Sequence, residues 1–228
     1  MEKRTVGKEL LADEIAQKIK NKIQNLVYKP GARLTVRKLC EEYGTSETPV
    51  KQALNQLVTT GLVISIPKCG MRVRTFEFED LKASWEARLM VEEYCAAFAV
   101  EEVRRNEAYV KKMQKCLEIS NTEYEKCIRD YTHENFNLLQ EYDRPIHMEI
   151  VNCCKNKPII DFYDGLNAHA GMYVGYRAHS PETLETVVQQ HTKIVDSLLL
   201  CDLDGLKSAL RQHIYSTIQI YRKASSKE

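Results

Sequence analysis

One aspartate and three histidines stand out as residues that could bind a metal ion. Asp143 and His147 are four residues apart, so on a helix they share one face. His191 and His213 lie in two later segments whose apolar spacing is typical of a buried helix face. Inward-facing histidines on successive helices can converge on one point. Three imidazoles and one carboxylate suit zinc, and also nickel or manganese, with coordination positions left open.

Structural roles can account for the same residues. Pro145 fits the first turn of a helix, which would place Asp143 at the very start of that helix as its N-cap. A single histidine on an apolar face is usually a satisfied core group, and an Asp and a His four residues apart are a weak signal by themselves. The spacing alone therefore favours structural roles. We expect the other histidines, His133, His169 and His179, to be surface or core residues.

The distribution of charge separates the first third of the chain from the rest. Residues 1–74 hold 14 Lys and Arg against 7 Asp and Glu, a net charge of +7, whereas residues 75–228 hold 19 against 25, a net charge of −6. This asymmetry indicates a polyanion-binding head on a body that binds something else, with chance clustering on solvated faces as the alternative. We expect two domains, residues 1–74 and 75–228.

The sequence shows no sign of secretion or of a membrane span. No apolar run approaches the roughly 18 residues that a transmembrane helix needs, and the N-terminus lacks the apolar segment of a signal peptide. The eight cysteines are irregularly placed and form no CxxC pair, which is typical of reduced thiols rather than a disulfide framework. We expect a cytoplasmic protein without a membrane partner.

Residues 1–74 carry the pattern of a winged helix-turn-helix. Apolar residues at every fourth position predict a helix over residues 11–27, with Val27 as its last inward side chain. A short helix near residues 35–43 and a tight turn at Gly44-Thr45 follow. A third helix should begin at Ser46 or Thr48, either of which can cap it. Two short strands joined by a turn at Lys68–Gly70 complete the domain.

The pattern after residue 75 is helical almost throughout, which predicts an antiparallel all-α bundle of six or seven helices. Ser180 followed by Pro181 is typical of an N-cap and a first helical residue, and Asp202 can cap the last helix. The fold class is therefore mainly α. After a first helix near Asp80, the expected helices cover residues 107–119, 122–141, 144–155, 158–178, 181–200 and 203–223.

The stretch PGARLTVRKLCEEYGTSETPVKQALNQLVTTGLVISIPKCGMRV resembles the N-terminal domain of the GntR family of bacterial transcription regulators. The resemblance implies a dimer that binds double-stranded operator DNA, with the third helix in the major groove and the wing near the minor groove. The sequence of this stretch differs from the family pattern at Val36, Glu47 and Cys69. The positions that match DNA-facing residues are Arg37, Ser46, Glu47, Thr48, Lys51, Lys68 and Gly70.

Glu47 stands where the family usually has arginine. An acid in the first turn of a helix is stabilised by the positive end of the helix dipole, by about 0.3–1 kcal/mol. A glutamate can also accept a hydrogen bond from a cytosine amino group. Helix electrostatics is the simpler interpretation, because it requires no DNA.

The segments ASWEARLMVEE, DRPIHMEIVNCCKNKPI and HTKIVDSLLLCDLDGLKSALRQHI resemble the all-helical FCD effector domain of the FadR-type branch of this family, in its shorter, VanR-like form. The resemblance covers residues 78–223. It implies a divalent metal held by Asp143, His147, His191 and His213, and a small carboxylate effector bound at the ion. The matching effector residue is Arg88, with a surface pair to Glu92 as the alternative; further candidates are Tyr173 and Arg177.

Together these features predict a homodimeric, ligand-responsive transcription regulator, acting as a repressor, that senses a small organic or sugar acid at a metal-centred cavity. One alternative is a metal-dependent hydrolase or lyase that uses the Asp/His centre and a bound water. Another is a DNA-binding protein whose effector pocket no longer works. We expect a regulator rather than an enzyme, because no glutamate in the matching segments is placed to act as a general base.

Overall fold

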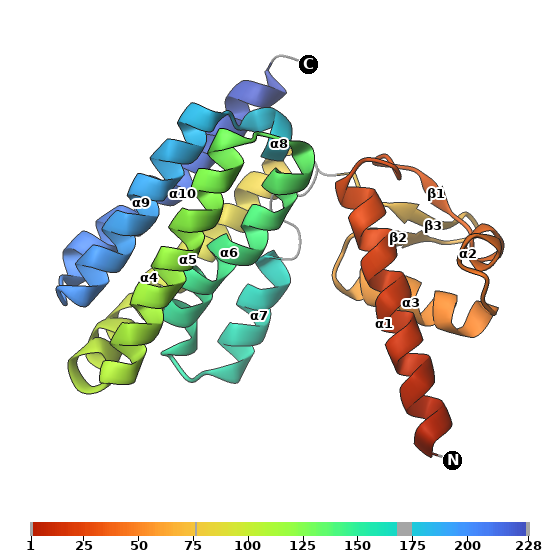
Figure 1. The fold of residues 1–228 in the computed structure, drawn as a ribbon, viewed down its shortest axis with the longest axis horizontal. Helices are drawn as coiled ribbons and strands as arrows, with labels where there is room; N and C mark the ends of the chain where they lie inside the picture. Colours follow the sequence, from red (N-terminus) through yellow and green to blue (C-terminus); the bar gives the residue numbers. More distant parts are fainter. Residues whose placement is uncertain (1, 76, 168–174, 227–228) are drawn as a thin grey trace. The chain divides into compact units, whose positions relative to one another are not determined.

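The computed structural model describes residues 2–75, 77–167 and 175–226, without the side chains of residues 2–9, Gln140 and Asn167. The chain divides into two compact units, Met1–Glu77 and Phe78–Glu228. Each unit is drawn in Figure 1. All eight cysteines are free thiols, as the sequence predicts. None of the described helices is both long enough and apolar enough to span a membrane.

The first unit packs three helices against a small sheet. Helix α1 (Glu2–Gln24) packs across α3 (Glu47–Thr59), and α2 (Val36–Tyr43) precedes α3 across a turn. Gly44 ends α2 with a φ of +61°, a left-handed conformation in which glycine has no steric cost. The core of the unit is aliphatic, and burying one such side chain contributes about 1.5–3 kcal/mol. It includes Ile15, Ile19, Ile23, Leu39, Val50, Leu54 and Leu57.

The sheet has the strand order β1-β3-β2 and is antiparallel throughout. Strands β2 (Val63–Ile66) and β3 (Gly70–Val73) form the predicted hairpin, in which Val63 pairs with Val73. Strand β1 (Arg33–Leu34) was not predicted, because two residues are too few to show an alternating pattern. The fold of this unit is a winged helix-turn-helix.

The prediction for the end of the first helix was wrong. Helix α1 ends at Gln24, and Leu26 then adopts a φ of +56°, which turns the chain before Lys29. Val27 is therefore off the helix and 63% exposed. Its spacing continued the apolar stripe, but the helix stopped one turn earlier.

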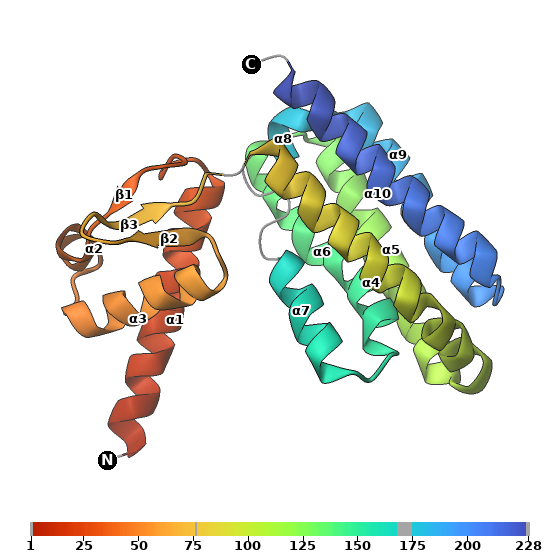
Figure 2. The ribbon, with the colours of Figure 1, turned by 180° about the vertical axis from the view of Figure 1, so that it is seen from behind.

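The second unit is an all-α bundle of seven described helices, as predicted. Helix α4 (Phe78–Arg105) lies between α6 (His133–Asn152) and α10 (Leu203–Ser225). Helix α9 (Pro181–Leu199) packs against α10 and α5 (Glu107–Arg129), and α5 packs against α6, which closes a ring of five helices. Figure 2 shows α4 and α10 side by side, with α7 (Lys157–Asn167) against α4. The short helix α8 (Gly175–Ala178) contacts α10.

Helix boundaries in the middle of this bundle differ from the prediction. Helix α5 runs unbroken to Arg129, and Thr132 caps α6 by accepting a hydrogen bond from the backbone amide of Asn135. Pro145 consequently lies inside α6, so Asp143 is neither at the start of a helix nor an N-cap. A proline inside a helix costs about 3 kcal/mol or more. The fully buried Ile146 and Ile150, which follow it on α6, offset part of that cost by packing in the core.

Other helix ends agree with the predicted capping. Ser180 caps α9 and Thr183 completes a capping box, while Pro181 is the first helical residue. Asp202 caps α10 by accepting a hydrogen bond of 2.9 Å from the amide of Gly205. These caps fix where α9 and α10 begin and hence the depth at which His191 and His213 lie. The helix predicted over residues 158–178 is α7 and α8, with residues 168–174 between them outside the described part of the chain.

Candidate metal centre and DNA-facing surface

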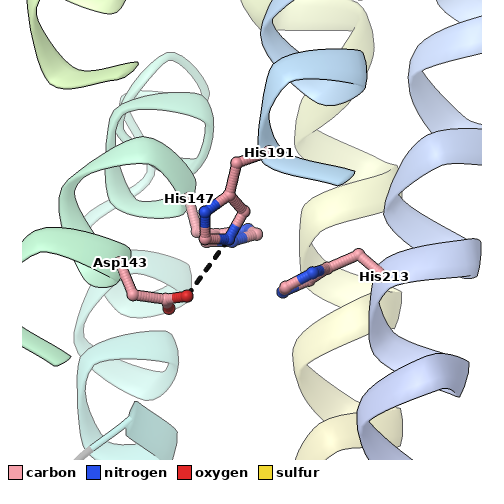
Figure 3. A group of neighbouring side chains, drawn as sticks. All are labelled: Asp143, His147, His191 and His213. Atoms are coloured by element: carbon pink, nitrogen blue, oxygen red, sulfur yellow. Dashed lines mark hydrogen bonds and ion pairs between the residues drawn. The ribbon is translucent and has the colours of Figure 1, made fainter. Parts of the chain in front are cut away.

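Four side chains from three helices meet inside the bundle. Asp143 and His147 come from α6, His191 from α9 and His213 from α10, and Figure 3 shows them pointing toward one another. One ligand atom from each lies within 4.8 Å of all the others. Nε2 of His191 is 3.1 Å from Oδ1 of Asp143 and 3.4 Å from Nε2 of His147. The three histidines are buried, and Asp143 is partly exposed.

Outer contacts orient two of the rings. Nδ1 of His147 lies 2.9 Å from Oε2 of Glu92, and Nδ1 of His213 lies 3.1 Å from Oε1 of Gln190. Burial lowers the pKa of both histidines. The neighbouring Arg88 lowers the pKa of His147 further, and the other two rings lower that of His213 further. Neutral rings that donate Nδ1–H outward leave the lone pair of Nε2 facing the cluster.

Asp143 is held as a carboxylate. Burial opposes its ionisation, but His191, His147 and Arg88 outweigh this and keep the pKa of Asp143 well below its ordinary value. The hydroxyl of Tyr124 donates a hydrogen bond of 3.1 Å to Oδ1, and Nη2 of Arg88 lies 3.9 Å from Oδ2. The cluster therefore contains one fixed negative charge beside the neutral rings of His147 and His213.

The alternative prediction, an ion pair between Arg88 and Glu92 on the surface, was wrong about where that pair lies. Nε of Arg88 does donate to Oε1 of Glu92, at 2.6 Å, but Arg88 is 8% exposed and Glu92 is fully buried. The hydroxyl of Tyr163 donates to the same oxygen at 2.5 Å. Burial opposes ionisation of Glu92, yet His147 and Arg88 hold the pKa of its carboxyl well below the ordinary value. A buried carboxylate with three donors is a rigid support for His147.

Sequence reasoning missed Glu92 as part of the site, although a signal was present. Glu92 lies one position after Val91 and three before Cys95, both buried, so it shares the inward face of α4 with Arg88. An acid on such a face requires partners. Tyr163 and Gln190 gave no comparable signal, because tyrosine and glutamine also occur on ordinary helix faces.

A cavity of about 90 Å³ adjoins the cluster, and its lining includes Arg88, Tyr124, Asp143 and His213. Its walls are mainly apolar, from Trp85, Phe136, Leu139, Leu184 and Val187. His179, Thr217 and Tyr221 complete the lining among the described residues. His179 was expected to be an ordinary surface or core residue, but it lines this cavity, because α8 places the start of α9 against Phe136 and Tyr221.

The structure places only some of the remaining candidate residues and histidines. Arg177 is on α8 and is not among the described residues that line the cavity. Tyr173 and His169 fall outside the described residues. His133 is half-buried at the start of α6, where its ring contacts Tyr176.

The donor set fits a divalent metal ion. Two ligand atoms about 2.1 Å from one ion lie at most about 4.2 Å apart, so a spread of 4.8 Å requires only a small contraction. His147 and His213 each have an outer partner that fixes the ring nitrogen facing inward, as metal-binding histidines usually do. His191 differs, because its Nδ1 is buried without a hydrogen-bond partner in the described part of the chain.

The residues that match DNA-facing positions are all exposed on the first unit. Ser46 precedes α3 in the N-cap position, though its side chain makes no capping hydrogen bond. Arg37 on α2 and Lys51 on α3 supply positive charge, while Thr48 lies in the first turn of α3. Lys68 and Gly70 form the hairpin turn of the wing, with φ of +61° and +85°. The exposed turn and the start of α3 are available to a large ligand.

Two cations of this surface, Lys51 and Arg37, are each paired with an acid one helical turn away. Nζ of Lys51 lies 2.7 Å from Oε2 of Glu47, and Nε of Arg37 lies 3.3 Å from Oε1 of Glu41. The pKa of Glu47 is lowered and that of Lys51 is raised by this contact. Glu47 thus lies in the first turn of α3, as helix electrostatics favours, and has an intrahelical partner that its sequence position alone did not suggest.

Comparisons with known proteins give the same division of the chain. Residues 11–73 match the model for bacterial regulatory proteins of the gntR family, and residues 83–216 match the FCD domain. The transcriptional regulator BphR of Paraburkholderia xenovorans is 24% identical over 193 residues, which cover 85% of this chain and 78% of that protein. The transcriptional repressor GlaR of Escherichia coli is 24% identical over 221 residues, covering 90% and 93%.

Solved structures share the fold. McbR/YncC of Escherichia coli superposes with a TM-score of 0.73 at 21% identity, over 93% of this chain and 97% of that one. A putative regulator from Rhodococcus sp. RHA1 gives a TM-score of 0.71 at 18% identity, over 92% and 96%. The chain therefore belongs to the GntR family of bacterial transcription regulators, with a winged helix-turn-helix that binds DNA and a ligand-binding FCD effector domain.

Proposed function

We propose that this regulator is a repressor that is controlled by a small carboxylic acid bound next to a zinc ion. The observation that carries the proposal is the meeting of Asp143, His147, His191 and His213 beside a cavity that contains Arg88. Binding of the acid would favour one arrangement of the two DNA-binding heads over another. The name of the relative GlaR, a transcriptional repressor, supports repression as the mode of action.

Zinc is the ion that this donor set suits best, with nickel and manganese as alternatives. Three imidazole nitrogens and one carboxylate oxygen are borderline ligands of the kind that zinc takes. The ion would supply a positive centre with an open position for a carboxylate. The protein contributes the fixed ring orientations of His147 and His213 and a buried enclosure around them.

Arg88 is the residue that we assign to the carboxylate of the effector. Its Nε is occupied by Glu92, but its Nη2 is buried and has no hydrogen-bond partner among the described residues. An unsatisfied buried donor is costly, and a charged acceptor relieves that cost. Because Nη2 lies 3.9 Å from Oδ2 of Asp143, a carboxylate bound there would also lie beside the metal cluster.

DNA binding would use Arg37, Ser46, Glu47, Thr48, Lys51, Lys68 and Gly70, all of them exposed. Lys51 and Arg37 suit phosphate or guanine contacts, which requires them to exchange their acidic partners for DNA. Regulators of this family typically work as dimers, so the operator should be close to palindromic. A protein that binds operator DNA in a bacterium works in the cytoplasm.

The apolar groove between α4 and α7 is the surface that we assign to the second copy of the chain. It has a volume of about 380 Å³ and its lining is almost wholly apolar. Met90 and Tyr94 of α4 and Phe162 of α7 are 63%, 55% and 51% exposed there. Exposed apolar side chains that gather in one place are typical of interaction sites. A dimer is the expected state of the family, which makes a second copy the fitting occupant.

Titration of operator DNA, with and without candidate acids, tests the proposal on protein whose metal content has been measured. We expect about one divalent ion per chain, a loss of operator binding when the right acid is added, and loss of that response after chelation or in His191→Gln. A His133→Gln variant should keep the bound ion, since His133 is neither a proposed ligand nor a partner of one. Metal-free protein that still responds to the acid would disprove the metal-centred mechanism.

The enzyme alternative has no support from the family, whose members are regulators. Glu92 is a further carboxylate in contact with the cluster, and its oxygens are taken by Arg88, Tyr163 and His147. A carboxylate engaged in this way is a poor general base. Turnover of any acid that stabilises the protein would revive this alternative.

A further inference from the structure

The cavity beside Arg88 is small for a ligand site. It has a volume of about 90 Å³, whereas a cavity in another protein that binds benzene, with its six carbons, has a volume of about 150 Å³. A six-carbon sugar acid is about twice the size of benzene, so it exceeds the available space. The volume fits an acid of about four to six non-hydrogen atoms.

The cavity offers one place for a carboxylate. Nη2 of Arg88 lies 3.9 Å from Oδ2 of Asp143, so the guanidinium and the proposed metal centre face the same point. Arg88 is the only lysine or arginine among the described lining residues. Burial lowers the pKa of His179, another lining residue, to about 4, which leaves that ring neutral at neutral pH. A second carboxylate would therefore find no second counter-charge among the described lining residues.

The walls reject a chain that carries many hydroxyls. Trp85, Phe136, Leu184 and Val187 are among the lining residues, and each hydroxyl buried against apolar atoms without a partner would cost about 1–3 kcal/mol. Only the few polar side chains of the described lining can satisfy such groups, and Thr217 is one of them. Thr217 donates its hydroxyl hydrogen to the carbonyl of His213 at 3.1 Å, which leaves its oxygen lone pairs as acceptors.

The wall formed by Phe136 and Tyr221 is tightly packed from behind. A Cβ on Gly175 would lie 2.7 Å from Cε1 of Phe136 and 2.8 Å from the hydroxyl oxygen of Tyr221, so the backbone of α8 already presses against both rings. Both rings line the cavity. Phe136 and Tyr221 are thus held between α8 and the ligand space.

We propose that the effector is a short monocarboxylate, of two to about four carbons with at most one hydroxyl or keto group, and that sugar acids and dicarboxylates are excluded. This inference rests on the proposed function of the site and narrows its ligand. It assigns the wall residues Phe136, Val187 and Tyr221 as the determinants of ligand length.

Calorimetric titration with a defined series of acids tests the inference. The series comprises acetate, propionate, lactate, butyrate and hexanoate, with succinate and gluconate as the excluded classes. We expect affinity to peak within the first four acids and to fall by about tenfold or more at hexanoate, since overfilling a packed cavity is destabilising. Succinate and gluconate should not bind. Tight binding of gluconate or succinate would overturn this inference about ligand size but would not contradict the proposed function as an acid-controlled repressor.

Two variants change the length of the cavity in opposite directions. Val187→Ala should extend the tolerated series toward longer acids, whereas Gly175→Ala, which forces Phe136 or Tyr221 inward, should weaken butyrate before acetate. Val195→Ala is the matched control, because Val195 is also buried on α9 but does not line the cavity. An unchanged length preference in both variants would overturn the assignment. Failure of every acid to bind, with operator affinity unaltered, would instead overturn the proposed function.

Discussion

Oε2 of Glu92 lies 2.9 Å from Nδ1 of His147, and both side chains are fully buried. The two residues are 55 positions apart in the sequence and come from α4 and α6. Glu92 also accepts from Arg88, so one carboxylate links the proposed metal ligand to the proposed effector residue. The position of the His147 ring and that of the Arg88 guanidinium are therefore coupled.

Glu92→Gln should weaken metal binding by about 10–100-fold, because the amide no longer provides a charged acceptor for the His147 ring. It should also lower the free energy of unfolding by about 3–5 kcal/mol, since Arg88 loses its buried counter-ion. Competition with a chromophoric chelator and urea denaturation measure the two effects. Glu86→Gln, at an exposed position on the same helix, is the control. Equal metal affinity in both variants would show that Glu92 does not orient the ligand.

Arg37→Ala and Lys51→Ala should each make the dependence of operator affinity on salt less steep by about one unit of log–log slope, as expected for the loss of one phosphate contact.

Glu47→Arg should tighten binding to DNA of unrelated sequence and change the preferred base at one operator position, since it removes the partner of Lys51 and adds a cation. Fluorescence anisotropy at several salt concentrations measures all three. Lys115→Ala, in the effector domain, should leave the slope unaltered.

Tyr94→Glu should convert the protein from a dimer to a monomer, because it places a charge in the apolar groove between α4 and α7. Sedimentation velocity would report a halved mass, and operator affinity should fall with it. Tyr215 on α10 is exposed to a similar degree, 51% against 55%, but lies outside that groove, so Tyr215→Glu serves as control. If the two variants sediment alike, the dimer forms on another surface.

The metal-free protein should lose stability as the pH falls from about 6.5 to about 4. Burial lowers the pKa of His179 from 6.5 to about 4, so within this window the unfolded chain binds a proton that the folded chain does not. The free energy of unfolding therefore decreases toward acid. His179→Gln should reduce the steepness of that decrease in urea titrations made in the presence of a chelator. Parallel pH profiles for the two proteins would contradict a buried, neutral His179.

The fold could be predicted where a pattern is local and repeated. Helical spacing, the Ser180 and Asp202 caps and the hairpin turn at Lys68–Gly70 each act over a few residues, and the structure has them where the sequence indicates. The end of α1 and the path of α6 through Pro145 depend on tertiary packing that no short window contains. The predictions for Val27 and Asp143 failed for this reason.

The candidate site could be predicted in part. Resemblance and spacing pointed to Asp143, His147, His191 and His213, which the structure brings together; their role as metal ligands stays a prediction. Glu92, Tyr124 and His179 were not assigned to the site, because their contacts with it cross from one helix to another. Only the packing of the ring of helices reveals which of several ordinary side chains face the cavity.

The spread of the four clustered residues over α6, α9 and α10 has a kinetic consequence. An ion held by Asp143 and His213 would close a loop of about 70 residues, and its ligands become neighbours only after α9 and α10 have docked. Its coordination bonds would therefore be absent from an early folding transition state and present in the native chain. Such an ion would lower the rate of unfolding and leave the rate of folding almost unchanged, so it would stabilise the native chain kinetically.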